Sequence, residues 1–419
     1  MATASLTIQS LAAQGDGEAL IEGKRIFVSF TLPGETVLAD VEGERGTLFE
    51  VASASPDRIA PVCKHFGSCG GCALQHAGPA VYGAFKRDQI THALASRALE
   101  FPIGDLIGIP PHSRRRAAFA VVRAGDDVTL GYHKARSQTV VEIQECPVLR
   151  PAIVAALPQL RTLAALALPR QGSAELHVTD TSHGLDVAIE GAGAEMTAKR
   201  RALLGGWMTA TSQVLRLTVD DEQIAARSEP RIAVSSHIVP LPPRSFLQAT
   251  AEAETEMMRL AEAAVVKLKS NAKIADLYAG LGAFSLALGK RHEVLAVEWD
   301  RLAVAALTKA ARQPGLRKID VLRRDLAREP LSVNELAPFS AVLFDPPRAG
   351  AEPQAAMLAK STVGTVIAVS CNPATFARDA RILVDGGYLI ESVTPIDQFL
   401  FTPHVELVAV FRKGKTRRS

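Results

Sequence analysis

Two residues near the end of the chain could carry out covalent and acid–base chemistry. Cys371 stands in the motif SCNP directly after the apolar run TVIAVS, so we expect it at the end of a strand. A cysteine with the usual pKa of about 8.5 needs an electropositive setting to act as a nucleophile at neutral pH. The following helix start and Arg378 could supply that setting. Glu406, in FTPHVELVAV, is the candidate base. The alternatives are a buried structural cysteine and an exposed strand glutamate.

A glycine-rich turn upstream predicts a cofactor site. The segment DLYAGLGAF follows an apolar strand, and its Gly280 and Gly282 allow the backbone to approach a bulky ligand. Ser285 stands where a dinucleotide fingerprint has its third glycine, so a dinucleotide fits poorly. Glu298 ends the next strand and could accept the hydroxyls of a ribose, while Asp325 could reach an adenine amino group. This pattern favours S-adenosylmethionine, although both carboxylates could be solvated strand ends.

The motif DPPR, residues 345–348, follows the strand AVLF. Its two prolines lock the loop and hold the Asp345 carboxylate in one place. Enzymes that methylate amino groups usually carry an aromatic residue after such a Pro-Pro pair, and here Arg348 follows, which disfavours nitrogen methylation. If the acceptor is carbon 5 of a uridine, that carbon is too weak a nucleophile to attack a sulfonium methyl unaided. Addition of a thiolate at carbon 6 would activate it, and a base would then remove the carbon-5 proton.

Four of the five cysteines form a second constellation. Cys63, Cys69 and Cys72 are close in sequence, with Gly70 and Gly71 between the last two, and Cys146 precedes a proline. The spacing favours a metal site over scattered buried thiols. It allows either a tetrahedral zinc or a [4Fe–4S] cluster, and it excludes the Cys-x3-Cys-x2-Cys pattern of a radical site built on S-adenosylmethionine.

The elements that must position these residues change in character along the chain. Residues 1–55 contain short β-rich runs separated by Gly and Pro, which predicts a five-stranded OB-like β-barrel. Residues 56–238 hold the cysteines, an amphipathic helix and short strands, which is typical of a mixed α/β domain. In residues 239–419 strands alternate with helices, which predicts a doubly wound, Rossmann-like parallel sheet. Ligands of such α/β sheets bind at the carboxyl ends of the strands, where the polar motifs stand.

Composition gives weaker constraints. A chain of 419 residues with 47% hydrophobic and 22% charged residues is ordinary for a globular protein of two or three domains. No apolar run is long enough to span a membrane, and the first 20 residues lack the pattern of a signal peptide, so a cytoplasmic protein is expected. The net charge of +3 is small, but the run Arg114–Arg116 and the tail from Arg412 to Arg418 are basic. These clusters could neutralise phosphates or simply be solvated.

Taken together, the motifs resemble those of a known family. The chain is similar to the bacterial 5-methyluridine RNA methyltransferases, which act on 23S ribosomal RNA and on tRNA. The resemblance covers nearly the whole chain. It rests on IQSLAAQGDGEAL, CKHFGSCGGCALQH, FLQAT, DLYAGLGAF, DPPRAG, SCNPATFARD and FTPHVELVAVF, which occur in the family's order.

The resemblance implies a role for each matching position. The N-terminal residues would form a TRAM domain that binds RNA, and the protein would act on RNA as a monomer. Cys371 would be the nucleophile and Glu406 the base. The residues that would contact S-adenosylmethionine are Gln248, Tyr278, Glu298, Asp325 and Asp345. The ligands of a [4Fe–4S] cluster would be Cys63, Cys69, Cys72 and Cys146. Because the tRNA-specific branch typically lacks these cysteines, 23S ribosomal RNA is the expected target and tRNA the alternative.

Three positions depart from the family pattern. Ala279 stands where the family often has cysteine, Ala283 where a polar residue is common, and Thr250 where asparagine is common. The last two bear on cofactor contacts. Two other interpretations of the whole chain remain at this stage: a cytosine-C5 RNA methyltransferase, which uses the same thiol addition, and an RNA-binding protein with an inactive methyltransferase fold.

Overall fold

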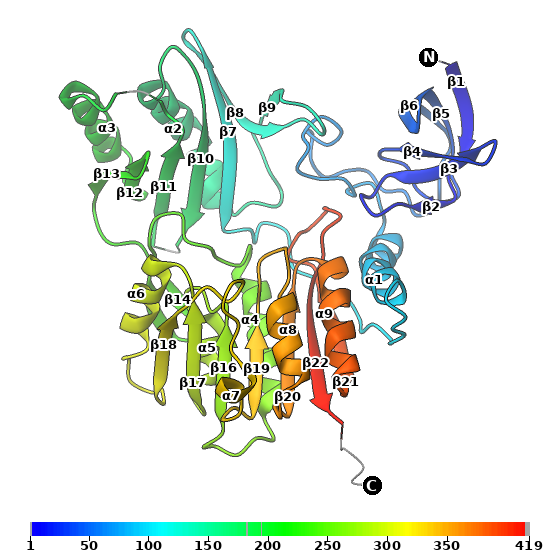
Figure 1. The fold of residues 1–419 in the computed structure, drawn as a ribbon. Coiled ribbons are helices and arrows are strands. Elements are labelled where there is room, and N and C mark those ends of the chain that lie inside the picture. Colours follow the sequence, from blue (N-terminus) through cyan, green and yellow to red (C-terminus); the bar gives the residue numbers. More distant parts are fainter. Residues whose placement is uncertain (1, 182, 194, 415–419) are drawn as a thin grey trace.

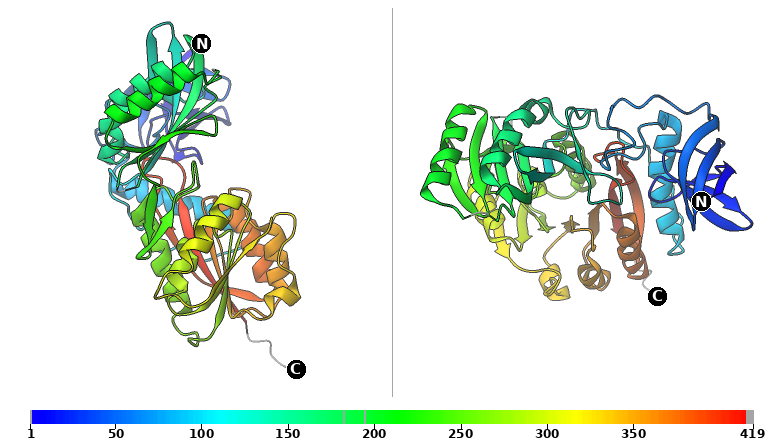
Figure 2. Two further views of the ribbon diagram at one scale, coloured as in Figure 1. Left: turned by 90° about the vertical axis from the view of Figure 1, so that its left-hand side faces the viewer. Right: turned by 90° about the horizontal axis from the view of Figure 1, so that it is seen from above.

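The computed structural model describes residues 2–181, 183–193 and 195–414, and the basic tail residues Lys415, Arg417 and Arg418 lie outside the described residues. Three large sheets follow one another along the chain (Figure 1). The first and second lie on the side of the third sheet to which its parallel strands point. Figure 2 shows the same arrangement from the side and from above. None of the helices in the described ranges is long and apolar enough to cross a membrane.

The first sheet has six strands in the order β1-β5-β6-β4-β3-β2 and curls around a small apolar core. Sequence analysis predicts five strands here; the additional one, β2, spans only two residues. The core contains Leu6, Val28 and Val37, which alternate with less buried residues along their strands, as a sheet with one buried face requires. The strands are β1 (Ala2–Thr7), β2 (Ser10–Leu11), β3 (Gly17–Ile21), β4 (Lys24–Val28), β5 (Thr36–Glu42) and β6 (Arg45–Ser53).

The second sheet has seven strands in the order β13-β12-β11-β10-β7-β8-β9. Two helices, α2 (Pro151–Ala167) and α3 (Ala198–Ala210), pack on it, and Leu160 and Trp207 join Phe119 of the sheet in one core. The first turn of α2 tolerates Pro151 because the first amides of a helix have no partner within the helix. The strands are β7 (Arg116–Ala124), β8 (Asp127–His133), β9 (Val140–Glu142), β10 (Gln171–Asp180), β11 (Leu185–Glu190), β12 (Val214–Val219) and β13 (Glu222–Ala226). A separate hairpin, β14 (Arg231–Val234) and β15 (His237–Pro240), leads to the third sheet.

The third sheet is the doubly wound, Rossmann-like sheet predicted from the sequence. Its order is β18-β17-β16-β19-β20-β22-β21, in which β22 alone runs antiparallel to the other six strands. The strands are β16 (Lys273–Leu277), β17 (Glu293–Glu298), β18 (Ile319–Arg323), β19 (Ala341–Phe344), β20 (Thr365–Ser370), β21 (Tyr388–Ile396) and β22 (Glu406–Lys413). The order reverses between β16 and β19, so their carboxyl ends open a crevice there.

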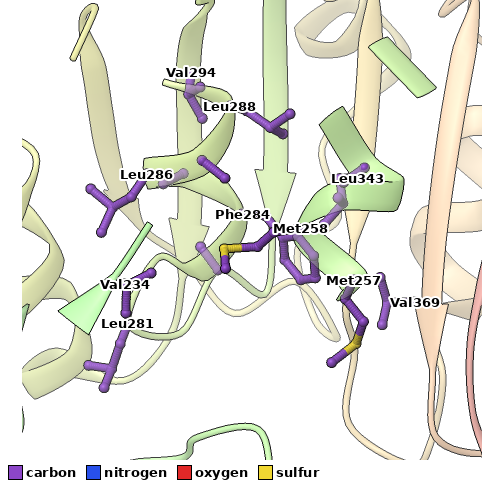
Figure 3. Close-up of a cluster of buried hydrophobic side chains, with 14 of the residues drawn as sticks. Val234, Met257, Met258, Leu281, Phe284, Leu286, Leu288, Val294, Leu343 and Val369 are labelled. Atoms are coloured by element: carbon purple, nitrogen blue, oxygen red, sulfur yellow. The ribbon is translucent and has the colours of Figure 1, made fainter. Parts of the chain in front are cut away.

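Helices cover both faces of this sheet, and each face has its own core. On one face Met257, Met258 and Phe284 pack on sheet residues such as Leu343 and Val369 (Figure 3). The helices there are α4 (Ala251–Val265), α5 (Ala283–Leu288) and α6 (Arg301–Ala310). The helices associated with the other face are α7 (Val333–Leu336), α8 (Glu352–Ala359) and α9 (Pro373–Asp385).

Helix α1 (Pro79–Ala95) also packs into the core that α7, α8 and α9 form on the third sheet, although α1 precedes the second sheet in sequence. Its Ile90 and Leu94 are buried with residues of the third sheet, and the helix packs against α9. The segment just after the clustered cysteines is therefore anchored to the third sheet rather than to the second.

Candidate active site

The glycine turn lies at the carboxyl end of β16, in the middle of the third sheet. Gly282 caps α5 with a left-handed φ of 88°, and a Cβ on it would lie 2.2 Å from a methyl carbon of Leu307. Gly280 is also left-handed, with φ 54°, but nothing lies within 4 Å of its Cβ position because it faces open space. The preceding Tyr278 has φ 61°, a conformation unusual for a residue with a side chain. The turn thus presents bare backbone to the crevice.

Two carboxylates end the neighbouring strands. The Glu298 side chain at the end of β17 accepts a hydrogen bond from the Gly280 N–H at 2.8 Å and others from the Trp299 and Asp300 N–H groups. Asp325 follows β18 and accepts from the Ala327 N–H at 3.1 Å. These bonds to the backbone fix both carboxylates at the rim of the crevice.

A chain of side chains connects the Asp345 loop to the end of the sheet. The Gln248 amide donates to Asp345 Oδ2 at 2.7 Å. Its own oxygen accepts from Gln398 Nε2 at 2.9 Å, and the same Nε2 donates to Glu406 Oε2 at 2.5 Å. Gln398 Oε1 accepts from the Ala249 N–H at 3.0 Å, which fixes the orientation of the amide. Burial and the negative charge of Asp276 raise the pKa of Asp345 to about 7.

Cys371 and Glu406 come from adjacent antiparallel strands. Ser370 is paired with Leu407, so the next residue on one strand and the preceding residue on the other meet at the same end. Glu406 is only 2% exposed; Gln398 donates to its Oε2, while its Oε1 has no hydrogen-bond partner. Burial, reinforced by the charge of Asp345, raises the pKa of Glu406 well above its usual range. The site therefore holds a carboxyl group with one oxygen free to exchange a proton.

The thiol of Cys371 lies in a less electropositive setting than the sequence suggests. Burial and the nearby Glu406 and Asp345 carboxylates raise its pKa to about 11, and Arg348 is the cation that opposes them. Arg378 is engaged elsewhere: it donates to the Ala349 carbonyl and is paired with acidic residues of α8 and α9. The Arg348 guanidinium in turn contacts the His404 ring at 3.0 Å.

The four clustered cysteines are free thiols that lie near one another. Burial, reinforced by the neighbouring thiols, raises the pKa of Cys72 to about 12. Backbone N–H groups point at some of these sulfurs, as the Gly71 N–H does at Cys69 Sγ, 3.4 Å away. Among the residues that the structure describes, no three of these sulfurs lie within 4.8 Å of one another.

All eleven residues singled out from the sequence line one cavity of about 1540 Å3. This cavity joins the crevice of the third sheet to the cysteine site, and residues of all three sheets contribute to it. The positions that depart from the family pattern lie close by. Ala283 lines the cavity and Ala279 is a buried part of its wall. Thr250 is instead the N-cap of α4, where its hydroxyl accepts from the Ala253 N–H at 3.1 Å.

Sequence reasoning missed Gln398 and His404 as members of the site, and it considered Arg348 only as a departure from an amino-methylation motif. Gln398 and His404 come from the loop between β21 and β22, and both line the cavity. The available signal was the polar residues of PIDQFLFTPHVE just before the candidate base.

Comparison with known proteins agrees with this geometry. Residues 208–414 match the model of the tRNA (uracil-5-)-methyltransferase family. An uncharacterised RNA methyltransferase of Brucella suis is 45% identical over 414 residues, which cover 99% of each chain. The 23S rRNA (uracil(1939)-C(5))-methyltransferase RlmD of Halomonas elongata is 34% identical over an alignment of 445 residues that covers 99% of this chain and 90% of that protein.

The fold is shared with a solved structure. The Pyrococcus abyssi tRNA (uracil-54, C5)-methyltransferase, in complex with S-adenosyl-L-homocysteine, matches with a TM-score of 0.73 at 22% identity, covering 97% of this chain and all of that one. The sequence relatives establish the class: the chain belongs to the uracil-C5 RNA methyltransferase family. It is an S-adenosylmethionine-dependent RNA (uracil-5-)-methyltransferase.

Proposed function

We propose that Cys371 and Glu406 divide the chemistry between them. The Cys371 thiolate forms a bond to carbon 6 of the target uracil, and the ring becomes an enolate with electron density at carbon 5. Carbon 5 then takes the methyl group from the sulfonium, which leaves as S-adenosylhomocysteine. Glu406 removes the carbon-5 proton, the carbon 6–sulfur bond breaks, and the thiolate is restored.

The observation that carries this assignment is the free, buried Oε1 of Glu406 beside the strand end that bears Cys371. A test compares two variants with labelled RNA. Cys371→Ala should neither methylate nor form a covalent complex. Glu406→Gln keeps the thiol but lacks the base, so it should transfer one methyl group and remain attached to the RNA as a slow band on a denaturing gel. Normal turnover by Glu406→Gln would show that another group is the base.

We propose that Gln248, Tyr278, Glu298, Asp325 and Asp345 hold S-adenosylmethionine. Glu298 and Asp325 end adjacent strands at the crevice, where a ribose and an adenine would meet acceptors. Asp345 lies next to Gln248 and near Cys371, which suits the charged methionine end of the molecule. Supporting this, the bare turn at Gly280 leaves room for the ligand.

We propose 23S ribosomal RNA as the target, with tRNA as the alternative. The cluster cysteines and the similarity to an enzyme named for 23S rRNA support the first choice. The structural likeness to an enzyme named for tRNA shows only a shared fold and does not favour the second. Mapping 5-methyluridine in both RNA pools from cells that lack this chain would decide, because only the true target loses its modification.

We propose that Cys63, Cys69, Cys72 and Cys146 ligate a [4Fe–4S] cluster. The support is that the four thiols are free and line one part of the cavity, in a motif that resembles the cluster motif of the family. Methyl transfer needs no electron, so the cluster would have a structural role. Protein purified without air should contain about four irons and as many sulfides per chain. Stoichiometric zinc without sulfide would contradict the assignment.

We propose that residues 1–55 form a TRAM domain that binds RNA, residues 56–238 a cluster-bearing central domain, and residues 239–419 the methyltransferase domain. The three sheets of the fold and the basic side chains between them support this division.

We also propose that the enzyme is a cytoplasmic monomer, because one chain supplies every candidate residue of the cavity. Light scattering during size-exclusion chromatography would test the monomer.

A further inference from the structure

The loop of residues 397–405, which we call the base loop, connects β21 to β22 and leads directly into Glu406. It supplies several side chains to the cavity, including Gln398 and His404. Gln398 donates to the candidate base, so the position of the loop sets the orientation of the Glu406 carboxyl group. In Figure 1 the loop rises from the third sheet toward the cysteine-bearing segment, beside α1.

A buried lysine of α1 binds both arms of this loop. Lys86 is fully buried, and its Nζ lies 2.8 Å from Asp397 Oδ1 in an ion pair. The same ammonium donates to the Phe399 carbonyl at 3.2 Å and to the His404 carbonyl. The ammonium therefore contacts oxygens at the beginning, middle and end of the loop, through one ion pair and two hydrogen bonds. Removing such a charge from water costs free energy, and the charge in turn holds its partners in one geometry.

Tyr82, one helical turn before Lys86, binds the same loop from the same helix face. Its hydroxyl donates to Asp397 Oδ2 at 2.7 Å and accepts from the Phe401 N–H at 2.9 Å. The Phe401 carbonyl accepts from the Ala73 N–H at 2.8 Å and from the Leu74 N–H at 3.1 Å. Phe401 has φ 62°, so its left-handed backbone is held from both sides.

These contacts tie the base loop to the cysteine site. Ala73 directly follows Cys72, and the side chain of Gln75 accepts from the Cys63 N–H at 3.1 Å while also hydrogen-bonding Cys72. A short stretch, residues 73–86, therefore contacts the cysteines at its start and the base loop along its length. A displacement at Cys72 would be passed to Phe401 through a single residue.

We propose that Tyr82 and Lys86 are positioning residues for Glu406, and that residues 73–86 couple the order of the four-cysteine site to the geometry of the catalytic base. This inference rests on the proposed role of Glu406. It gives the cysteine site a function in the reaction that requires no electron transfer: it keeps the base loop in the arrangement needed for proton removal and release of the RNA.

The test uses the full-length holoprotein with Tyr82→Phe and Lys86→Met. Arg87→Met is the matched control, because Arg87 lies on the same helix but pairs with the exposed Asp105. We expect both variants to bind S-adenosylmethionine within about threefold of the native protein and to keep their iron. Release of methylated RNA should slow by about tenfold or more, since full loss of a base costs ~10²–10⁴-fold. The adduct on Cys371 should accumulate.

Hydrogen exchange supplies a readout that does not depend on activity. Amides of residues 398–406 should exchange faster than in the native protein in three variants, Tyr82→Phe, Lys86→Met and Cys72→Ser. Their exchange rates should be unchanged in Arg87→Met. Normal release and normal exchange in Tyr82→Phe and Lys86→Met would overturn the proposal. Equal losses of ligand affinity and thermal stability with no adduct would also overturn it, because they indicate a merely structural role. Glu406→Gln is assayed in parallel: if it forms no adduct, the failure lies in the assignment of the base.

Discussion

The two oxygens of Glu406 have different surroundings, and this difference matters for its proposed role. Gln398 donates to Oε2, whereas Oε1 is buried without a partner. Burial disfavours the charged form, while the donated hydrogen bond favours it. The pKa of the carboxyl is raised overall, which suits a group that must take up a proton from carbon.

At the scale of single residues, the mutual effect of Cys371 and Glu406 can be measured. The Glu406 carboxylate raises the pKa of the thiol, which is about 11. Glu406→Gln keeps the shape and removes the negative charge, so the pKa of Cys371 should fall. Alkylation of Cys371 by iodoacetamide between pH 8 and 10.5 should become several-fold faster, because below its pKa the thiolate fraction grows about tenfold per unit. Arg348→Met should slow alkylation. Equal rates in all three proteins would show that these charges do not act on the thiol.

Gln398→Met tests the orientation of the base. Methionine fills a similar volume but cannot donate to Glu406, so the pKa of Glu406 should rise further and less of it should be ionised at neutral pH. A hydrogen bond to a charged group contributes roughly 1.5–3 kcal/mol, which corresponds to a shift of about one to two pKa units. The rising limb of turnover against pH should move to higher pH by that amount, with activity recovered there. A loss of turnover that is the same at every pH would contradict this role.

Much of this polar constellation could be predicted from the sequence, and part of it could not. Glu298 ends an apolar strand, and Asp345 and Cys371 each directly follow one, so the rule that parallel strands end at one edge brings the three together. Gln398 has no such signal, because its partners lie about 150 residues away or across a loop. The cation beside Cys371 was also unpredictable. Arg378 is the nearer arginine in sequence, but side-chain packing pairs it with Asp379, and Arg348 is the cation that acts on the thiol.

At the scale of elements, the glycine turn offers a matched pair of substitutions. Gly280→Ala and Gly282→Ala both force a side chain into left-handed backbone, which costs about 1–2 kcal/mol. Only at Gly282 would the new methyl collide with Leu307, so this variant should show the lower melting temperature. The methyl of Gly280→Ala points into the open cavity. This variant should therefore lose more affinity for S-adenosylmethionine than Gly282→Ala does, although it loses less stability. Calorimetry measures both quantities. Full ligand affinity in Gly280→Ala would show that the cofactor does not occupy this space.

The third sheet was predictable because its strands and helices alternate with clear hydrophobic patterns and short turns. The N-terminal sheet was less so: β2 is a two-residue strand, too short to leave a pattern. The sequence of α1 predicts a helix but does not say which core the helix joins. Its buried Ile90 and Leu94 would suit either sheet, and only the packing against α9 decides.

At the scale of the whole molecule, the small net charge of +3 conceals an uneven distribution. Arginines from all three parts of the chain line the cavity, among them Arg45, Arg116, Arg136 and Arg348. If about four of them neutralise phosphates of single-stranded RNA, affinity should fall roughly 50-fold between 50 and 200 mM salt. Filter binding with Cys371→Ala, which cannot react, would measure this slope without the covalent step. Affinity that is independent of salt would exclude phosphate contacts as the main source of binding.

The measurement that tests the central claim most directly is the identification of a trapped intermediate on RNA that carries 5-fluorouridine. In this analogue fluorine replaces the carbon-5 hydrogen, and a base cannot remove it. The native enzyme should therefore stall after methyl transfer, before the bond to Cys371 breaks. Mass spectrometry of the digested complex should find a methylated 5-fluorouridine attached to Cys371, only when S-adenosylmethionine is present and not with 5-fluorocytidine RNA. Attachment at another residue, or trapping by the cytidine analogue instead, would contradict uracil methylation through Cys371.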